Sequence, residues 1–335
     1  MTDALLVLGG SGFVGPAVAE AGLARGFAVT TFHRTASGWT HPEVQVLRGD
    51  RLDPASLAPL RQRTWDLVVD TWSGAPRAVR DSARALSDHA HRYAYISSES
   101  VYRPPPPRGV DESAPTVEAD PDAEATDYAA DKRGGELAAQ DAFGDRALLA
   151  RAGTILGPYE NVGRLTWWLR RMARGGEVLC PGPPELPIQF IDARDLAGFV
   201  IDAATAGHSG PFNLVCRRGH ATMGALLEAC GATAGAADTR LTWVAPDAIA
   251  AAGIEPWTEL PVWLPDDDEY AGMHDANVER ARAAGLHCRP LTDTVRDTWA
   301  WLSALPAPPP LRDGAMPAGL APMREREVLR AWAAR

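Results

Sequence analysis

The sequence of 335 residues is almost without lysine: of its 33 lysine and arginine residues, only Lys132 is a lysine. An ammonium is a compact point charge with rotatable donors, whereas a guanidinium is planar and forked. Lys132 follows Tyr128 by four residues, which places both side chains on one face of a helix. Because a nearby cation lowers the pKa of a phenol, Tyr128 is predicted to be a general acid or base.

The alternative is an ordinary aromatic and cation pair on a helix surface. With six tyrosines in 335 positions, a randomly placed lysine falls four residues after a tyrosine in about 2% of cases. Chance is therefore a weak account of this spacing, and the rest of the sequence must decide whether the pair belongs to a functional site.

The chain also lacks an excess of positive charge, since its formal net charge is -10. Nucleic acid and anionic membrane surfaces attract clustered cations, so neither is expected as a partner.

The four cysteines lie far apart without metal-ligand spacing, which predicts neither a disulfide framework nor a metal site. No hydrophobic run is long enough to span a bilayer, and the N-terminus lacks the basic segment of a signal peptide. We expect a cytoplasmic protein with a small-molecule substrate.

Apolar runs of strand length alternate with helical patterns, which is typical of a parallel sheet with crossover helices. The predicted fold class is α/β, with a Rossmann-type doubly wound parallel sheet formed by residues 1–157 and by later returns near 187–216. Strands are expected at 4–8, 28–32, 44–47, 67–70, 93–97, 147–151 and 212–215, and helices at 14–25, 54–62, 77–89 and 128–143.

Residues 158–305 are expected to form a smaller, mostly helical substrate lobe, and residues 306–335 a linker and a C-terminal helix. Within this half, helices are predicted at 162–175, 221–234 and 323–334, and a short strand at 241–244. The segment 103–126 is rich in proline and acid and has no periodicity, so we expect a solvated surface loop, with a lid over the site as the alternative.

Three glycines, Gly9, Gly12 and Gly15, follow the first expected strand, and Phe13 and Val14 open the next helix. Such a turn lets the backbone approach a pyrophosphate, and the helix N-terminus offers free N–H groups to it. The sequence therefore predicts a dinucleotide site.

The second expected strand ends in Phe32-His33-Arg34, without the acid that usually holds the ribose 2'-hydroxyl of NAD. Arg34 suits a 2'-phosphate, so NADP is the favoured cofactor and NAD the alternative. An exposed arginine in an arginine-rich protein is the competing interpretation.

The glycine turn, Ser98 after the fifth strand, and Tyr128-x-x-x-Lys132 together resemble the extended short-chain dehydrogenase/reductases of the NAD-dependent epimerase/dehydratase superfamily. The resemblance covers most of the chain and continues through 151–158 and 189–196. It implies that Tyr128 exchanges a proton with the reacting oxygen and that Ser98 hydrogen-bonds the same oxygen. Lys132 would hold the nicotinamide ribose and lower the pKa of Tyr128.

The resemblance further implies contacts to the cofactor. Asp50 matches the acid that contacts the adenine, and the family's common dimer predicts a possible homodimer through helices 77–89 and 128–143. The other cofactor-binding candidates lie beside Asp50 or at strand ends on the nicotinamide side: Arg51, Thr71, Trp72, Ser73, Ala152 and Thr154.

Two departures from the family pattern bear on the substrate. Thr154 stands where members acting on nucleotide sugars often carry asparagine. Glu99 matches an acid of sugar dehydratases, but Ser100 replaces the glutamate that follows it there. Candidate substrate contacts are Ser98 and Glu99, which the resemblance implies, and Trp72, Trp257 and Trp263, because large aromatics can line a pocket.

The predicted function is that of an NADP-dependent oxidoreductase of the ketoreductase or alcohol dehydrogenase type. Hydride would pass between nicotinamide C4 and a small organic substrate, with Tyr128 as the acid or base. One alternative is a sugar or nucleotide-sugar epimerase or dehydratase with a transiently reduced cofactor. A second is a non-catalytic regulator that binds the cofactor, because a fold alone does not fix function.

Overall fold

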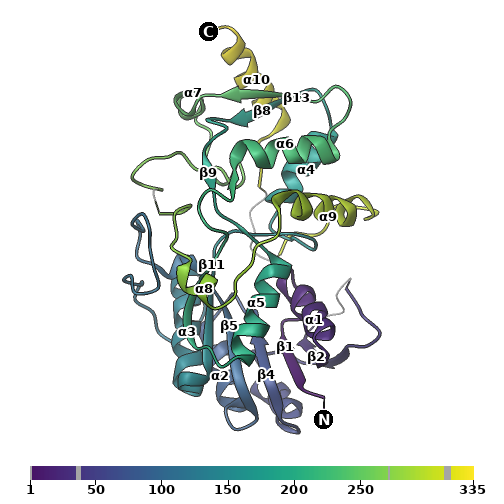
Figure 1. The fold of residues 1–335 in the computed structure, drawn as a ribbon, viewed down its shortest axis with the longest axis vertical. Helices are drawn as coiled ribbons and strands as arrows, with labels where there is room; N and C mark the ends of the chain where they lie inside the picture. Colours follow the sequence, from purple (N-terminus) through teal and green to yellow (C-terminus); the bar gives the residue numbers. More distant parts are fainter. Residues whose placement is uncertain (1, 35–38, 271, 313–317) are drawn as a thin grey trace.

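The computed structural model describes residues 2–34, 39–270, 272–312 and 318–335. Figure 1 shows a parallel sheet flanked by helices, with a second lobe above it that ends in the C-terminal helix. The sheet has seven strands within the described residues, in the spatial order β11 (Gly210–Leu214), β6 (Ala147–Ala152), β5 (Ala90–Ser98), β4 (Trp65–Asp70), β1 (Ala4–Leu8), β2 (Ala28–His33) and β3 (Gln45–Arg48).

Helices cover both faces of this sheet. On one face α1 (Val14–Ala24) packs against α5 (Ala193–Thr205), and on the other α2 (Pro76–Leu86) packs against α3 (Tyr128–Phe143). Strand β1 is buried along its whole length because both of its faces meet helices. The predicted α/β fold class is confirmed.

All the strands of this sheet run parallel, so their carboxyl ends meet at one edge. The strand order reverses between β1 and β4, and ligands of open α/β sheets bind at such a reversal. The helix expected at 54–62 is the 3-10 helix η1 (Pro54–Arg61), which contains Pro59. Proline removes a backbone donor and disfavours a regular α-helix there.

The second lobe has its own core. Strands β8 (Glu177–Pro181) and β13 (Arg240–Val244) pair in parallel. The helices around them are α4 (Leu165–Ala173), α6 (Met223–Ala234), α7 (Pro246–Ala251), α9 (Leu291–Ser303) and α10 (Pro322–Ala333). Helix α10 belongs to this core, since Val328 and Leu329 are buried in it and Glu325 forms a buried ion pair with Arg171.

The remaining elements are short. They are η2 (Glu99–Val101), η3 (Gly144–Arg146), β7 (Ile155–Leu156), β9 (Pro187–Ile188), β10 (Ile191–Asp192), β12 (Ala221–Thr222) and α8 (Glu279–Ala283). The expectation of a solvated loop at 103–126 is wrong for part of that segment. Val110 is buried against Ala276 and Val278 and forms a bridge with Ala276. Thr116 forms a bridge with Tyr102, so this part of the loop is also held in place.

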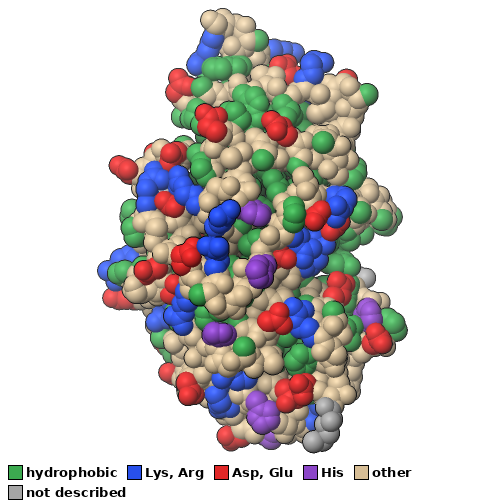
Figure 2. All heavy atoms as spheres, in the orientation of Figure 1, with side chains coloured by type: hydrophobic (Ala, Val, Ile, Leu, Met, Phe, Trp, Pro, Cys, Tyr) green, Lys and Arg blue, Asp and Glu red, His purple; other side chains and the backbone are tan. Residues whose placement is uncertain are grey.

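Acidic and basic side chains are interspersed over the face shown in Figure 2. Among the helices formed by the described residues, none combines the length and apolarity needed to cross a bilayer.

Candidate active site

A cavity of about 460 Å³ opens where the carboxyl ends of the strands face the second lobe. Its walls come from parts of the chain far apart in sequence. The glycine turn contributes Gly12, Phe13 and Val14; the ends of β4, β5 and β6 contribute Thr71, Ser73, Ser98 and Thr154; helix α3 contributes Tyr128 and Lys132. The sequence placed all these residues in one site, and the structure brings them together.

The glycine turn fits a dinucleotide phosphate. Gly9 has a φ of +95°, which other residues rarely adopt, and so turns the chain sharply after β1. A Cβ at Gly12 would meet nothing nearer than the Gly9 oxygen at 3.9 Å, so the open space beside it is available to a ligand. Helix α1, which includes Gly15 in its first turn, has no side-chain cap and no acid there. Its free N–H groups are therefore available to an anion.

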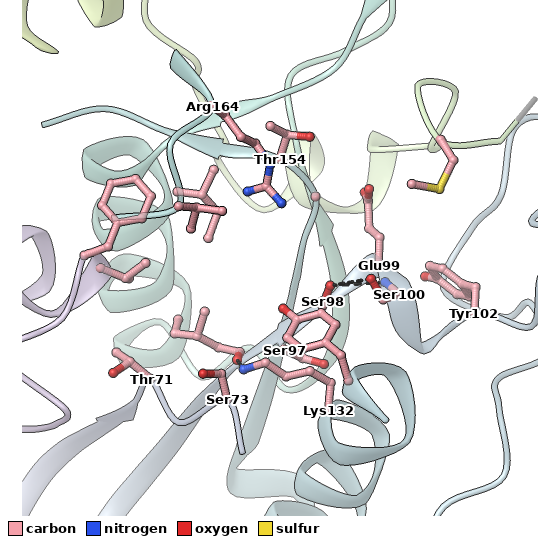
Figure 3. A pocket seen from close by; sticks show the side chains of 18 of the residues that line it. Thr71, Ser73, Ser97, Ser98, Glu99, Ser100, Tyr102, Lys132, Thr154 and Arg164 are labelled. Atoms are coloured by element: carbon pink, nitrogen blue, oxygen red, sulfur yellow. Dashed lines mark hydrogen bonds between the residues drawn. The ribbon is translucent and has the colours of Figure 1, made fainter. Parts of the chain in front are cut away.

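Lys132 extends from α3 toward Thr71 and Ser73 (Figure 3). The side chain is only 3% exposed, and its Nζ donates hydrogen bonds to the carbonyl oxygens of Trp72 at 2.5 Å and Ile96 at 2.7 Å. Burial lowers its pKa to about 7, with Asp70 acting in the opposite direction. The lysine thus joins the ends of β4 and β5 to α3.

Tyr128 is the first residue of α3, where the Asp127 side chain caps the helix by accepting from the backbone N–H of Ala130. Its side chain is 42% exposed because it faces the cavity. Ser98 is the last residue of β5, and its Oγ donates to the Oγ of Ser100 at 3.1 Å, the contact dashed in Figure 3. Both hydroxyls are therefore placed to meet a ligand in the same cavity.

Glu99 also lines the cavity. Its Oε1 is buried and has no hydrogen-bond partner among the described residues. Burial, assisted by the charge of Glu112, raises its pKa to about 8. The carboxyl is therefore mostly protonated at neutral pH and able to donate a proton.

Eight predicted site residues do not line this cavity: Gly9 and Gly15 of the glycine turn, Arg34 and Asp50 beyond β2, and Arg51, Trp72, Ala152 and Trp263. Arg51 is 4% exposed and forms a buried ion pair with Asp70, so its guanidinium is not available to a cofactor. Trp263 is 1% exposed in the core of the second lobe, where its indole donates to the Gly182 oxygen. Ala152 is buried at the end of β6. The buried side chains of Arg51 and Trp263 therefore cannot make the predicted contacts, whereas the predicted contact at Ala152 stays a prediction.

The side chain of Trp72 also lies outside the cavity wall. Its indole N–H donates to the Ala75 oxygen, and the guanidinium of Arg51 stacks over its ring at 5.2 Å. Its backbone carbonyl, not its side chain, acts at the site, by accepting from Lys132 and from the hydroxyl of Tyr95. The predicted substrate contact through the indole is wrong, because that side chain is held by Ala75 and Arg51.

Arg34 and Asp50 lie together at the surface beyond β2. Their charged atoms are 3.9 Å apart, and both side chains are substantially exposed. The pair is open to solvent and to a ligand, and its predicted contact with the cofactor stays a prediction.

Sequence reasoning missed the cavity wall built by the second lobe. Arg164 precedes α4, Asn161 lies in the loop before it, and Arg312 lies in the C-terminal segment. Trp257, which was predicted, lines the cavity with a strained φ of +63°. The loop 103–126 adds Pro106 and Val110, so part of it covers the site. Contacts this distant in sequence leave no local pattern.

The described residues contain no group of three or more His, Cys, Asp or Glu side chains placed to hold a metal ion. The fold and the cavity define a Rossmann-type protein of the extended short-chain dehydrogenase/reductase type. Residues 5–214 match the NAD dependent epimerase/dehydratase family, and the chain belongs to that family. The resemblance seen in the sequence is confirmed.

Among curated proteins, the chain is similar to y4nG of Sinorhizobium fredii (strain NBRC 101917 / NGR234), with 25% identity over 228 residues. The match covers 62% of this chain and 55% of that relative, so it spans about half the relative's length.

Two solved structures illustrate the similarity of fold. The enzyme WbmH of Bordetella bronchiseptica in complex with NAD+ is 19% identical, with a TM-score of 0.66 over 91% of this chain and 100% of that one. The UDP-N-acetylglucosamine 4-epimerase of Methanobrevibacter ruminantium M1 in complex with UDP-N-acetylmuramic acid is 18% identical, with a TM-score of 0.67 over 91% and 99%. At this identity the similarity bears on the fold.

Proposed function

We propose that the chain is a nicotinamide-dependent oxidoreductase that interconverts a secondary alcohol and a ketone on a small organic molecule. The observation that carries this proposal is the placement of Ser98, Tyr128 and Lys132 in one cavity with the glycine turn. The bound cofactor would supply hydride acceptance and donation at its nicotinamide C4. A regulator that only binds the cofactor needs the glycine turn and not these three side chains.

The roles of the three residues follow from their contacts. Tyr128 exchanges the proton of the reacting hydroxyl, since it is the cavity phenol at the head of α3. Ser98 positions the same oxygen through its hydroxyl. Lys132, already held by two carbonyls, retains one N–H for the ribose of the cofactor.

We also propose NADP as the cofactor. Arg34 supports this proposal because its exposed guanidinium lies at the end of β2, where a 2'-phosphate is recognised. Asp50 beside it opposes the proposal by adding a negative charge, and NAD is bound by the structurally similar enzyme WbmH. Measured affinities for both cofactors decide between them.

A second candidate function is an epimerase or dehydratase acting on a sugar or nucleotide sugar, with the cofactor reduced and reoxidised in one turnover. Glu99 favours it, because a buried, protonated carboxyl in the cavity offers a second proton donor beside Tyr128. The titles of structurally similar proteins, such as the UDP-N-acetylglucosamine 4-epimerase, point the same way.

One experiment separates the candidates. The protein is incubated with NADPH or NADH and panels of ketones and nucleotide sugars, and both reduced cofactor and organic products are followed. Stoichiometric loss of reduced cofactor supports the oxidoreductase. Sugar conversion with no net change in cofactor supports the second candidate. The absence of turnover on both panels, together with no measurable cofactor binding, would contradict both.

A further inference from the structure

Two arginine side chains line the cavity without forming an ion pair there. They are Arg164 and Arg312, and within the described residues neither guanidinium forms a hydrogen bond or an ion pair with another side chain. Burial lowers the pKa of Arg164, the charges of Glu160 and Tyr128 act in the opposite direction, and the nearby charge of Arg312 lowers it further. Like charges brought together in one cavity repel each other, so an anion bound between the two guanidinium groups would be stabilised by both.

The backbone at Arg164 is held in place by Glu160. The buried carboxylate of Glu160 accepts the backbone N–H groups of residues 164, 165 and 166 at 2.5, 3.0 and 3.3 Å, which fixes the start of α4. The guanidinium stacks over the Trp257 ring at 5.0 Å. Figure 3 shows it pointing into the space between Thr154 and Ser98. A stacked, preorganised guanidinium loses little freedom when it binds an oxyanion.

Arg312 reaches the cavity from the C-terminal segment. Its backbone N–H donates to the Asn161 oxygen at 2.9 Å, which ties this segment to the loop before α4. Its guanidinium lies 5.7 Å from the centre of the Tyr128 ring. A substrate whose reacting carbon lies at Tyr128 would therefore have Arg312 beside it.

The other charged groups of the cavity permit an anion there. The carboxylate of Glu160 already accepts hydrogen bonds from the N-terminus of α4 and is fully buried. Glu99 is raised in pKa to about 8 by burial, so it carries little negative charge at neutral pH. Lys132 lies on the cofactor side, where Thr71 and Ser73 line the wall.

We propose that Arg164 and Arg312 bind an oxyanion of the substrate, a carboxylate or a phosphate, while its alcohol or ketone carbon lies at Tyr128. Guanidinium groups bind both kinds of oxyanion through paired N–H donors. The inference rests on the proposed function, because it assigns the substrate class of the same cavity: hydroxy or keto compounds that carry a negative charge.

The test is a calorimetric titration of the protein saturated with NAD or NADP, so that the cofactor covers the glycine turn. The phosphate probe is UDP with uridine as its neutral counterpart, and the carboxylate probe is glucuronate with glucose as its counterpart. We expect one anionic probe to bind more tightly than its counterpart, and the responding probe identifies the source of the charge.

The variants Arg164→Gln and Arg312→Gln should each weaken that probe by about tenfold, the effect of losing one charged hydrogen bond. Arg312→Lys keeps the charge and should lose less. Arg282→Gln, at an exposed ion pair on α8, is the matched control and should have no effect.

Binding of neither anion, or undiminished binding in Arg312→Gln, would overturn the proposal; that residue is exposed, so its loss should leave the fold intact. Because no turnover is measured, a failed anion site leaves the proposed function standing. Anion binding without any hydride transfer would instead contradict the proposed function alone.

Discussion

The ammonium of Lys132 donates a hydrogen bond to the backbone carbonyl of Trp72, at an Nζ to O distance of 2.5 Å. This contact joins α3, which carries Tyr128, to the end of β4, where the nicotinamide half of a dinucleotide is expected. The same nitrogen also donates to the Ile96 oxygen on β5. The position of the cation therefore depends on three elements.

Lys132→Arg should keep the charge and lose most of the activity. The side chain is 3% exposed, and a planar guanidinium cannot reproduce the two carbonyl contacts in the same space. We expect turnover to fall by about 100-fold or more, the scale of a lost acid–base group. Steady-state kinetics with the substrate identified from the ketone and nucleotide-sugar panels measures this loss of turnover. Near-full turnover would mean that the lysine has no special role.

Glu99→Gln should change the pH dependence of stability. The pKa of Glu99 rises from 4.5 to about 8 on folding, so the folded protein binds the extra proton between these values. Its contribution to stability is complete below about 4.5 and is lost as pH rises through about 8. The wild type should therefore lose stability relative to the variant across this window.

Urea unfolding of both proteins at several pH values across this window measures the effect. Glu118→Gln, an exposed residue of the nearby loop, is the control and should follow the wild type. Parallel pH profiles for wild type and Glu99→Gln would show that Glu99 is ionised in the folded protein.

Arg34→Gln should weaken NADP binding by about tenfold and change NAD binding little, since only NADP carries the 2'-phosphate. Fluorescence or calorimetric titration with each cofactor gives the two affinities. Arg61→Gln, at an exposed position at the end of η1, serves as the control. Equal losses for both cofactors, or none, would leave NADP without support from this residue.

Asp70→Asn should destabilise the protein by about 3–5 kcal/mol, because it leaves the buried charge of Arg51 uncompensated. The pair has contacts of 2.5 and 2.6 Å, and the Tyr93 hydroxyl also donates to Asp70. The free energy of unfolding in urea measures the loss. Asp297→Asn, at a more exposed ion pair, should cost much less. Similar losses in both variants would argue against a special role for burial.

Local patterns predicted the sheet and half of the site. The glycine turn and Tyr128-x-x-x-Lys132 have fixed short spacings, so Gly12, Tyr128 and Lys132 could be placed in one cavity from the sequence. The resemblance to the family implied the strand-end positions Thr71 and Thr154, which line the same cavity because parallel strands end at one edge of the sheet.

The sequence-based predictions that failed concern side chains whose position depends on the direction in which they point or on contacts with residues far away in the sequence. Arg51 and Trp72 were placed near the right strand ends, but the buried charge of Asp70 draws the Arg51 guanidinium away from the cavity. Arg164 and Arg312 are 148 positions apart (312 minus 164) and meet only through the packing of the second lobe. In an arginine-rich chain, no composition signal distinguishes these two from the rest.

The most direct test of the account is the rate of hydride transfer in Tyr128→Phe, measured under single-turnover conditions with saturating cofactor and the identified substrate. We predict a fall of about 10²–10⁴-fold with cofactor affinity unchanged, since the phenol transfers the proton and does not bind the dinucleotide. A rate within a few fold of the wild type would contradict the assignment of Tyr128 as the acid or base of this site.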